Sequence, residues 1–256
     1  MQIGPGTPAI VLGGVSCLGV ATARALSARG AKVAILDRDV PRAAELAREI
    51  GGFACDTDVT DAQNVQDAVA WAAKAHGPAR IAVACAGIAP AARTLDRAGK
   101  PHDPALFAQV IAVNLAGSFH LAAAAAAAMG AIDPLEKDGE RGAIVMTSSV
   151  AAFEGQIGQA AYAASKGGIA ALVLPLARDL ARSGIRVAAI APGLFRTPML
   201  AGLPEDVQAS LGAQVPFPAR LGDPAEFAAL VLHIAENPML NGSVIRLDGA
   251  IRMAPK

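Results

Sequence analysis

Residues 9–20 read AIVLGGVSCLGV. The apolar run AIVL predicts a buried strand, and the helical apolar period that starts at Val20 predicts a helix. Between them lies a glycine-rich turn, Gly13 to Gly19. In a strand, turn and helix of this kind, the free N–H groups of the helix N-terminus can bind a pyrophosphate. A glycine turn taken alone is equally consistent with a simple tight connection between two elements.

Asp37 favours the cofactor interpretation of the turn. It closes the next strand-like run, Lys32 to Leu36, and follows Gly19 by 18 residues. A carboxylate about 20 residues beyond such a turn can bind the ribose hydroxyls of an adenosine. Its charge would repel the 2′-phosphate of NADP, so Asp37 favours NAD. The neighbouring Arg38 is either a solvated surface residue or, if it turns inward, a partner for that phosphate.

The alternation of apolar runs and helical stretches continues along the chain. It predicts one doubly wound α/β domain over residues 1–256, a Rossmann fold with a parallel seven-stranded sheet and helices on both faces. Two polar, turn-rich stretches, 93–104 and 133–142, are predicted to be surface loops. Besides the two strands already named, strands are predicted at Ile81 to Cys85, Ala143 to Thr147, Arg186 to Ile190 and Ser243 to Leu247, and helices at Gly19 to Arg29, Arg42 to Ile50, Pro104 to Met129 and Ala160 to Arg182.

Composition excludes several classes of protein. The 256 residues are 54% hydrophobic with a formal net charge of zero, which disfavours a nucleic acid or an acidic membrane as partner. The apolar run that comes nearest to a membrane span is Leu121 to Met129. It has nine residues. A membrane-spanning helix needs about 20, so we expect no membrane span. Three scattered cysteines and four unclustered histidines predict a reducing, cytoplasmic location and no metal site.

Tyr162 and Lys166 stand four residues apart in a predicted helix, which places them on one helix face. A nearby ammonium is expected to lower the pKa of the phenol, so that it can exchange a proton with a substrate oxygen. Ser149 ends a strand 13 residues before Tyr162 and can hold the same oxygen. Asn114 places a polar amide side chain in an otherwise apolar predicted helix, where a buried amide requires hydrogen-bond partners.

These four residues resemble the Asn, Ser, Tyr and Lys tetrad of the short-chain dehydrogenase/reductase family, and the match extends over nearly the whole chain. The segments SSVAAFEGQIGQAAYAASKGGI (148–169), IAPGLFRTPML (190–200), QVPFPARLGDPAEFA (214–228) and LNGSVIRLDGAIRM (240–253) are similar to the branch that acts on 3-hydroxyacyl-CoA esters. The resemblance implies that Asn114, Ser149, Tyr162 and Lys166 are catalytic.

The resemblance also implies a cofactor site and a substrate site. Ser149, Tyr162 and Gln159 would contact the substrate, and a segment at about 194–214 would cover it as a lid. Cys85 stands where the wider family has Asn, and Asn114 would hold a water in a proton relay. The residues expected to bind NAD are Gly13, Ser16, Leu18, Gly19, Asp37, Asp58, Val59, Cys85, Gly87, Tyr162, Lys166, Phe195 and Thr197.

Two positions depart from the family's TGxxxGxG turn. Leu12 replaces the Thr, and Cys17 replaces the middle Gly. Since glycine is used where the backbone approaches closely or has a positive φ, a side chain at Cys17 is expected to crowd the backbone or the pyrophosphate and weaken NAD binding.

The expected activity is NAD-dependent interconversion of 3-hydroxyacyl-CoA and 3-oxoacyl-CoA by a homotetramer, with branched 2-methyl-3-hydroxyacyl-CoA esters and hydroxysteroids as further substrates. One alternative is an NADPH-dependent 3-oxoacyl reductase that acts on a carrier protein or CoA ester, against which Asp37 speaks. The other is a non-catalytic NAD-binding scaffold protein, suggested by Leu12 and Cys17 and opposed by the complete tetrad.

Overall fold

A parallel sheet runs through the centre of the computed structural model, which describes residues 1–135, 138–197 and 205–255. Within those residues the sheet has seven strands in the order β3-β2-β1-β4-β5-β6-β7. Every neighbouring pair is parallel. The chain therefore winds outward in both directions from β1 and β4. The strands are β1 Pro8–Leu12, β2 Lys32–Asp37, β3 Phe53–Asp56, β4 Ile81–Ala84, β5 Gly142–Thr147, β6 Ile185–Pro192 and β7 Val244–Leu247.

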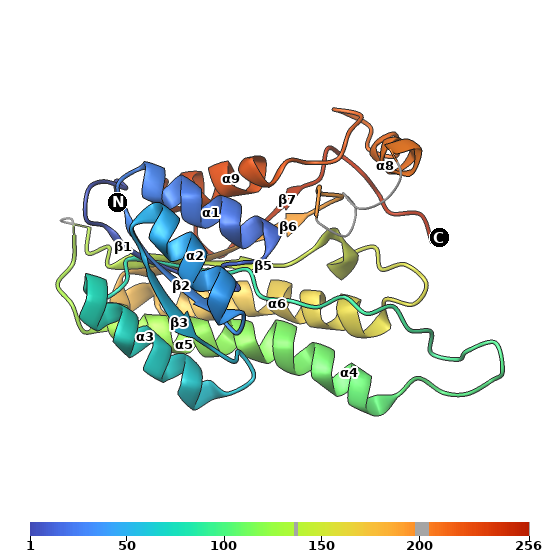
Figure 1. Ribbon diagram of the computed structural model, residues 1–256, viewed down its shortest axis with the longest axis horizontal. Coiled ribbons are helices and arrows are strands. Elements are labelled where there is room, and N and C mark those ends of the chain that lie inside the picture. The colour runs from blue at the N-terminus through green and yellow to red at the C-terminus, as the bar shows by residue number, and fades with distance from the viewer. Residues whose placement is uncertain (136–137, 198–204, 256) are drawn as a thin grey trace.

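Helices cover both faces of the sheet, as Figure 1 shows. One face carries α1 (Cys17–Ala28), α2 (Val40–Ile50) and α9 (Pro224–Glu236). The other carries α3 (Ala62–His76), α5 (Gly117–Gly130) and α6 (Ala160–Asp179). Preceding α5 without a break are α4 (Pro104–Val110) and a π-helical turn, Ile111–Ala116. A further helix, α8 (Glu205–Gly212), lies beyond the sheet near the C-terminal segment.

The core consists of two apolar layers, one on each face of the sheet. Successive strand residues alternate between them: Val11 and Ile35 pack with α1, α2 and α9, whereas Leu12 and Leu36 pack with α3, α5 and α6. This alternation follows from the two-residue period of a strand. Both layers are largely apolar because a parallel sheet is buried on both faces.

The predicted fold class is confirmed, with small differences in the bounds of its elements. No residue range was predicted for the short strand β3, because its sequence, FACD, has no extended apolar run. Helix α1 begins at Cys17 rather than Val20, since the Ser16 side chain accepts a hydrogen bond from the Gly19 amide and caps the helix there. The stretch 93–104 is a loop up to Pro104, where α4 begins.

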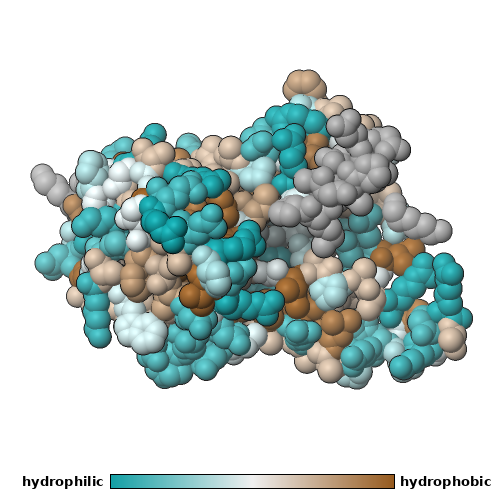
Figure 2. All heavy atoms as spheres, viewed as in Figure 1, coloured by the Kyte–Doolittle hydropathy of each residue, from teal (hydrophilic) through white to brown (hydrophobic). Residues whose placement is uncertain are grey.

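Two helical stretches are long and apolar enough to cross a membrane by length and composition alone. They are Pro104–Gly130 and Ala160–Asp179, with mean hydropathies of 1.7 and 1.4. Our expectation of no membrane span rested on a single apolar run and did not consider these longer stretches, and it stays a prediction. Core helices of α/β proteins have the same composition, and α5 and α6 both pack on the sheet. On the face seen in Figure 2, hydrophilic and hydrophobic side chains are interspersed.

Candidate active site

The glycine turn after β1 approaches the loop after β4 too closely for a side chain. Gly13 has a φ of 72°, and a Cβ there would lie 2.3 Å from the amide nitrogen of Ala86. A Cβ on Gly19 would lie 2.2 Å from the carbonyl oxygen of Gly13. These two glycines let the backbone pass closely at the N-terminus of α1, beside the neighbouring strands β1 and β4, from which the chain winds in opposite directions. Ligands of doubly wound sheets bind at this position.

A cavity of about 620 Å³ extends from this turn toward the end of β2. Gly13, Ser16, Asp37, Asp58 and Val59 line it, as predicted for a cofactor site. The Asp37 carboxylate accepts hydrogen bonds from the amides of Val15 and Asp39, each at 3.1 Å, which holds it beside the turn.

The wall of this cavity also carries basic side chains. Arg38 and Arg42 both line it, and Arg38 is exposed. Arg42 donates a hydrogen bond to the Val15 carbonyl at 3.1 Å. Hydrogen bonds from Thr60 to the Asp58 carboxylate lower the pKa of Asp58. The wall of this cavity therefore carries both carboxylates and guanidinium groups.

A second cavity, of about 870 Å³, meets the first at Gly87 and Ile88. Ser149 and Tyr162 both line it, as do Leu18, Gln159, Phe195 and Thr197. Ser149 follows β5, and its hydroxyl oxygen accepts a hydrogen bond from the Ala151 amide at 3.1 Å. The Ser149 hydroxyl keeps its proton for donation, and it hydrogen-bonds with Tyr162. Apolar side chains, among them Val150 and Leu194, form much of the remaining wall.

Tyr162 and Lys166 lie on one face of α6, but their electrostatics differ from our expectation. Burial raises the pKa of the Tyr162 phenol, and a hydrogen bond with Ser149 opposes this rise. Burial lowers the pKa of Lys166 to about 8. The Lys166 ammonium donates to the Thr147 carbonyl at 2.7 Å and lies 5.8 Å from the Tyr162 ring centre. Lys166 is therefore directed at the backbone rather than at the phenol, whose pKa it was expected to lower.

Asn114 has a structural explanation in the π-helical turn. Its side chain is fully buried and forms a pair of hydrogen bonds with the backbone of Ile88, at 2.8 and 2.9 Å. A third bond, at 3.0 Å, reaches the Ser165 hydroxyl on α6. Asn114 thus joins the loop after β4, where the two cavities meet, to the helix that carries Tyr162 and Lys166.

Several predicted residues lie behind the cavity walls rather than in them. Three of them are buried and line neither of the two cavities that the described residues form: Gly19, Asn114 and Lys166. Cys85 is buried with its sulfur 3.9 Å from the Thr147 hydroxyl, and burial raises its pKa to about 11. The lid expected at 194–214 falls partly on residues 198–204, which lie outside the described residues.

Cys17 does not strain the turn. It is the first residue of α1, and among the described residues only Ala250 combines a side chain with a positive φ. Its thiol donates to the Arg196 carbonyl at 3.1 Å and lines the second cavity. The backbone at Cys17 therefore does not need a glycine, whereas the expected crowding of the pyrophosphate stays a prediction. Leu12 is fully buried in the core.

This chain is similar to known proteins over most of its length. A family model described as short chain dehydrogenase matches residues 7–208. The chain belongs to the short chain dehydrogenase family. It is therefore an oxidoreductase that binds a nicotinamide cofactor, consistent with the glycine turn at the first cavity and the Ser149 and Tyr162 hydroxyls in the second.

Relatives of this dehydrogenase match over almost their full length. The human protein named 3-hydroxyacyl-CoA dehydrogenase type-2 is 52% identical, with 98% of this chain and 97% of the relative covered. The Drosophila melanogaster protein of the same name is 48% identical, with 96% and 97% covered. A crystal structure of 3-hydroxyacyl-CoA dehydrogenase type-2 from Mycobacterium avium superposes with a TM-score of 0.92 at 42% identity and covers 98% of both chains.

Some residues that shape the site of this dehydrogenase have no signature in its sequence. The Thr147 and Ile88 backbones hold Lys166 and Asn114, and the Ser148 hydroxyl donates to the Lys166 carbonyl at 2.9 Å. Backbone partners of this kind can be any residue type, so only the fold identifies them.

Proposed function

We propose that this dehydrogenase interconverts 3-hydroxyacyl-CoA and 3-oxoacyl-CoA esters with NAD. The observation that carries the proposal is the second cavity, which combines two adjacent hydroxyls, of Ser149 and Tyr162, with an apolar wall. Such a site suits a secondary alcohol or ketone attached to an acyl chain. The names of the full-length relatives support the acyl-CoA class of substrate.

The residues present fit a dinucleotide. A Cβ on Gly13 would collide with the Ala86 backbone, and residues around the start of α1 line both cavities: Gly13 and Ser16 the first, Cys17 and Leu18 the second. In the proposed complex, Gly13, Ser16, Leu18 and Gly19 surround the pyrophosphate, Asp37 binds the adenosine ribose, and Asp58 and Val59 flank the adenine. Gly87, Phe195 and Thr197 lie near the nicotinamide. When bound, the nicotinamide supplies the hydride acceptor or donor.

The proton transfer is proposed to use Tyr162. Because burial raises its pKa, the Tyr162 phenol is protonated at neutral pH and placed to donate a proton to a 3-oxo oxygen. Ser149 would donate a hydrogen bond to the same oxygen and fix its position. Lys166 would bind the nicotinamide ribose, and Asn114 would position the α6 residues through Ile88 and Ser165.

The test is the initial rate of acetoacetyl-CoA reduction with NADH and, separately, with NADPH. Faster turnover with NADH is expected because the Asp37 carboxylate would repel a 2′-phosphate. A preference for NADPH would mean that Arg38 outweighs Asp37 and that the chain is a 3-oxoacyl reductase. NADH binding without hydride transfer to any alcohol or ketone tested would indicate a non-catalytic NAD-binding protein.

Asp37→Asn removes the charge of this carboxylate. The amide oxygen can still accept the hydrogen bond from Val15, whereas the side-chain NH2 replaces the oxygen that accepts from the Asp39 amide, so one of the two hydrogen bonds is lost. We expect the ratio of kcat/KM with NADPH to that with NADH to rise at least about tenfold, or about 1.4 kcal/mol. Asp56→Asn is the matched control, since Asp56 is the exposed register partner of Asp37 on β3 and lines neither cavity. An unchanged ratio in Asp37→Asn would remove Asp37 from cofactor selection.

We also propose a cytoplasmic homotetramer. Phe107, Phe119 and Leu174 are 39 to 44% exposed on α4, α5 and α6, and these helices are the expected contact between subunits. All three cysteines are free, as a reducing compartment would keep them. Sedimentation analysis of the purified protein tests the assembly, and a mass of one or two subunits would contradict it.

A further inference from the structure

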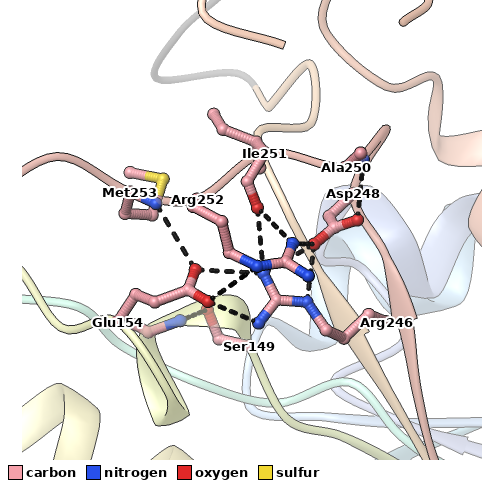
Figure 3. Close-up of polar contacts among 9 residues, drawn as sticks. Ser149, Glu154, Arg246, Asp248, Ala250, Ile251, Arg252 and Met253 are labelled. Atoms are coloured by element: carbon pink, nitrogen blue, oxygen red, sulfur yellow. Dashed lines mark hydrogen bonds and ion pairs between the residues drawn. The ribbon is translucent and has the colours of Figure 1, made fainter. Parts of the chain in front are cut away.

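The C-terminal segment is fastened to the loop that follows Ser149 by a cluster of charged side chains, shown in Figure 3. Arg246, on β7, forms two parallel hydrogen bonds with the Glu154 carboxylate, at 2.8 and 3.0 Å. Its Nε donates to Asp248 at 2.7 Å, and its guanidinium lies 5.4 Å from the centre of the Phe153 ring. Arg246 and Glu154 are each 22% exposed, so this pair is partly shielded from water.

The same cluster continues into the segment after β7. Arg252 contacts Asp248 and Glu154, each at 3.3 Å, and Arg246 donates to the Ile251 carbonyl at 2.9 Å. The Met253 amide donates to Glu154 at 3.4 Å. Glu154 therefore holds both β7 and the segment that follows it.

Two further hydrogen bonds to backbone carbonyls extend this attachment toward residue 255. The Gln156 side chain donates to the Ala254 carbonyl, and the Ile157 amide donates to the Pro255 carbonyl, both at 3.0 Å. Residues 253–255 thus run beside residues 154–157, which connect the Ser149 strand to the Tyr162 helix. The path of the segment is fixed at several points rather than by one contact.

This attachment places one apolar side chain against the substrate. Met253 is half-buried and lines the same cavity as Ser149, Tyr162, Gln156 and Gln159. Gln156 both lines the cavity and binds the segment, so the wall and its support are contiguous. A methionine is long, flexible and apolar, which suits a wall that contacts hydrocarbon.

We propose that Met253 is a specificity-determining residue that limits the length of the acyl chain, and that Glu154 is the residue that positions it. The inference rests on the proposed function and names a determinant of its substrate. Met253 lies in the part of the chain that runs beside Gln156, and both residues line the cavity. Removal of its side chain lengthens the space open to hydrocarbon, and a larger side chain shortens it.

Two substitutions of opposite effect test the role of Met253. For each protein, kcat/KM is measured with 3-oxobutanoyl-CoA, 3-oxooctanoyl-CoA and 3-oxododecanoyl-CoA. We expect Met253→Ala to raise the ratio of the dodecanoyl to the butanoyl value by at least about tenfold, the lower end of the discrimination that one methylene gives in an apolar pocket. Met253→Phe is expected to lower the same ratio. Met239→Ala, at an 87% exposed methionine outside the cavity, is the matched control and should leave the ratio as in the parent.

Glu154→Gln tests the positioning role. It keeps the shape of the side chain but removes the charge that holds Arg246 and Arg252. The ratio is expected to move in the direction of Met253→Ala, by a smaller factor. A residue that only stabilises the fold would lower all three kcat/KM values together, so an unchanged ratio in a folded Glu154→Gln protein would overturn this part of the inference.

Binding is measured separately, by calorimetric titration of the NADH-loaded proteins with saturated butanoyl-CoA and dodecanoyl-CoA, which cannot react. If the parent reduces the 3-oxo esters and Met253→Ala leaves the length ratios of turnover and binding unchanged, the role of Met253 is wrong and the proposed function stands. If no ester is reduced but the length preference of binding shifts in Met253→Ala, the proposed reaction fails and the role of Met253 holds. If no 3-oxo ester is reduced and no saturated ester binds, both the proposed reaction and the role of Met253 are wrong.

Discussion

At the scale of single residues, the phenol oxygen of Tyr162 is the atom on which the proposed chemistry depends. Tyr162→Phe removes this oxygen and keeps the ring. We expect turnover to fall by roughly 10²- to 10⁴-fold, or about 3 to 5 kcal/mol of barrier, because general acid catalysis is lost. The measurement is kcat for acetoacetyl-CoA reduction, with NADH affinity and thermal stability as controls for the intact fold. Turnover equal to that of the parent would exclude Tyr162 from proton transfer.

Lys166 predicts a pH dependence of cofactor binding. Burial lowers its pKa to about 8, so its positive charge is present below this pH and lost as the pH rises through it. Its nitrogen lies 3.5 Å from where a Cβ on Gly87 would be, at the junction of the two cavities. Since the cofactor is an anion, its affinity should fall with rising pH.

Fluorescence titration with NADH between about pH 7 and about pH 9.5 measures this effect. We expect the dissociation constant to rise several-fold with a midpoint near the pKa of Lys166. In Lys166→Arg the guanidinium stays charged over this range, so the rise should disappear. Lys74→Met, at an exposed lysine on α3, is the control and should retain it. A flat profile in the parent would contradict a charged Lys166 beside the cofactor.

At the scale of elements, the turn between β1 and α1 depends on glycine for two separable reasons. Gly13 and Gly51 both have a positive φ, of 72° and 64°. A Cβ on Gly13 would meet the Ala86 backbone, whereas a Cβ on Gly51 would meet nothing within 4 Å. Gly51→Ala therefore measures the conformational penalty alone, which is about 1 to 2 kcal/mol.

Gly13→Ala adds the collision with Ala86 to that penalty. We expect a larger loss of unfolding free energy than in Gly51→Ala and a fall in NADH affinity of at least about tenfold, since the loops after β1 and β4 must separate. Urea unfolding and NADH titration of both variants give the comparison. Equal affinities for NADH in the two variants would show that the close approach at Gly13 does not shape the cofactor site.

At the scale of the whole molecule, one buried ion pair connects elements far apart in the chain. Arg186, on β6, donates two hydrogen bonds to Glu140, at 2.9 and 2.7 Å, and both side chains are less than 10% exposed. Arg186 also donates to the carbonyls of Ile234, Ala235 and Leu240 around the end of α9. Glu140 has a second partner, the amino group of Met1, at 2.5 Å.

Arg186→Met breaks this pair and leaves Glu140 and three carbonyls without the guanidinium. We expect the free energy of unfolding to fall by about 3 to 5 kcal/mol, the usual effect of removing one partner from a buried pair. Arg24→Met removes an equally short ion pair, that with Glu49, in which both side chains are about half exposed. This change should lower the free energy of unfolding by no more than about 1 kcal/mol. Urea unfolding tests both, and similar losses in the two variants would contradict the role of burial.

The sequence by itself determined the order of strands and helices, the glycine turn and the spacing of Ser149, Tyr162 and Lys166. These features depend on the local period of apolar residues and on residue types with restricted roles. The match to a known family supplied the rest of the expected site. The short strand β3 and the exact start of α1 were missed, because FACD has no apolar period and the Ser16 cap depends on a single hydrogen bond.

Only the tertiary structure decided which groups lie together around the site. It directed Lys166 to the Thr147 carbonyl and Asn114 to the Ile88 backbone, placed Cys17 on an unstrained helix start, and set Met253 in the wall of the second cavity. Such contacts join residues distant in the chain, and many of the partners are backbone atoms that every residue type has. The pKa of Tyr162 and that of Lys166 are governed by burial, and burial is a property of the packed molecule.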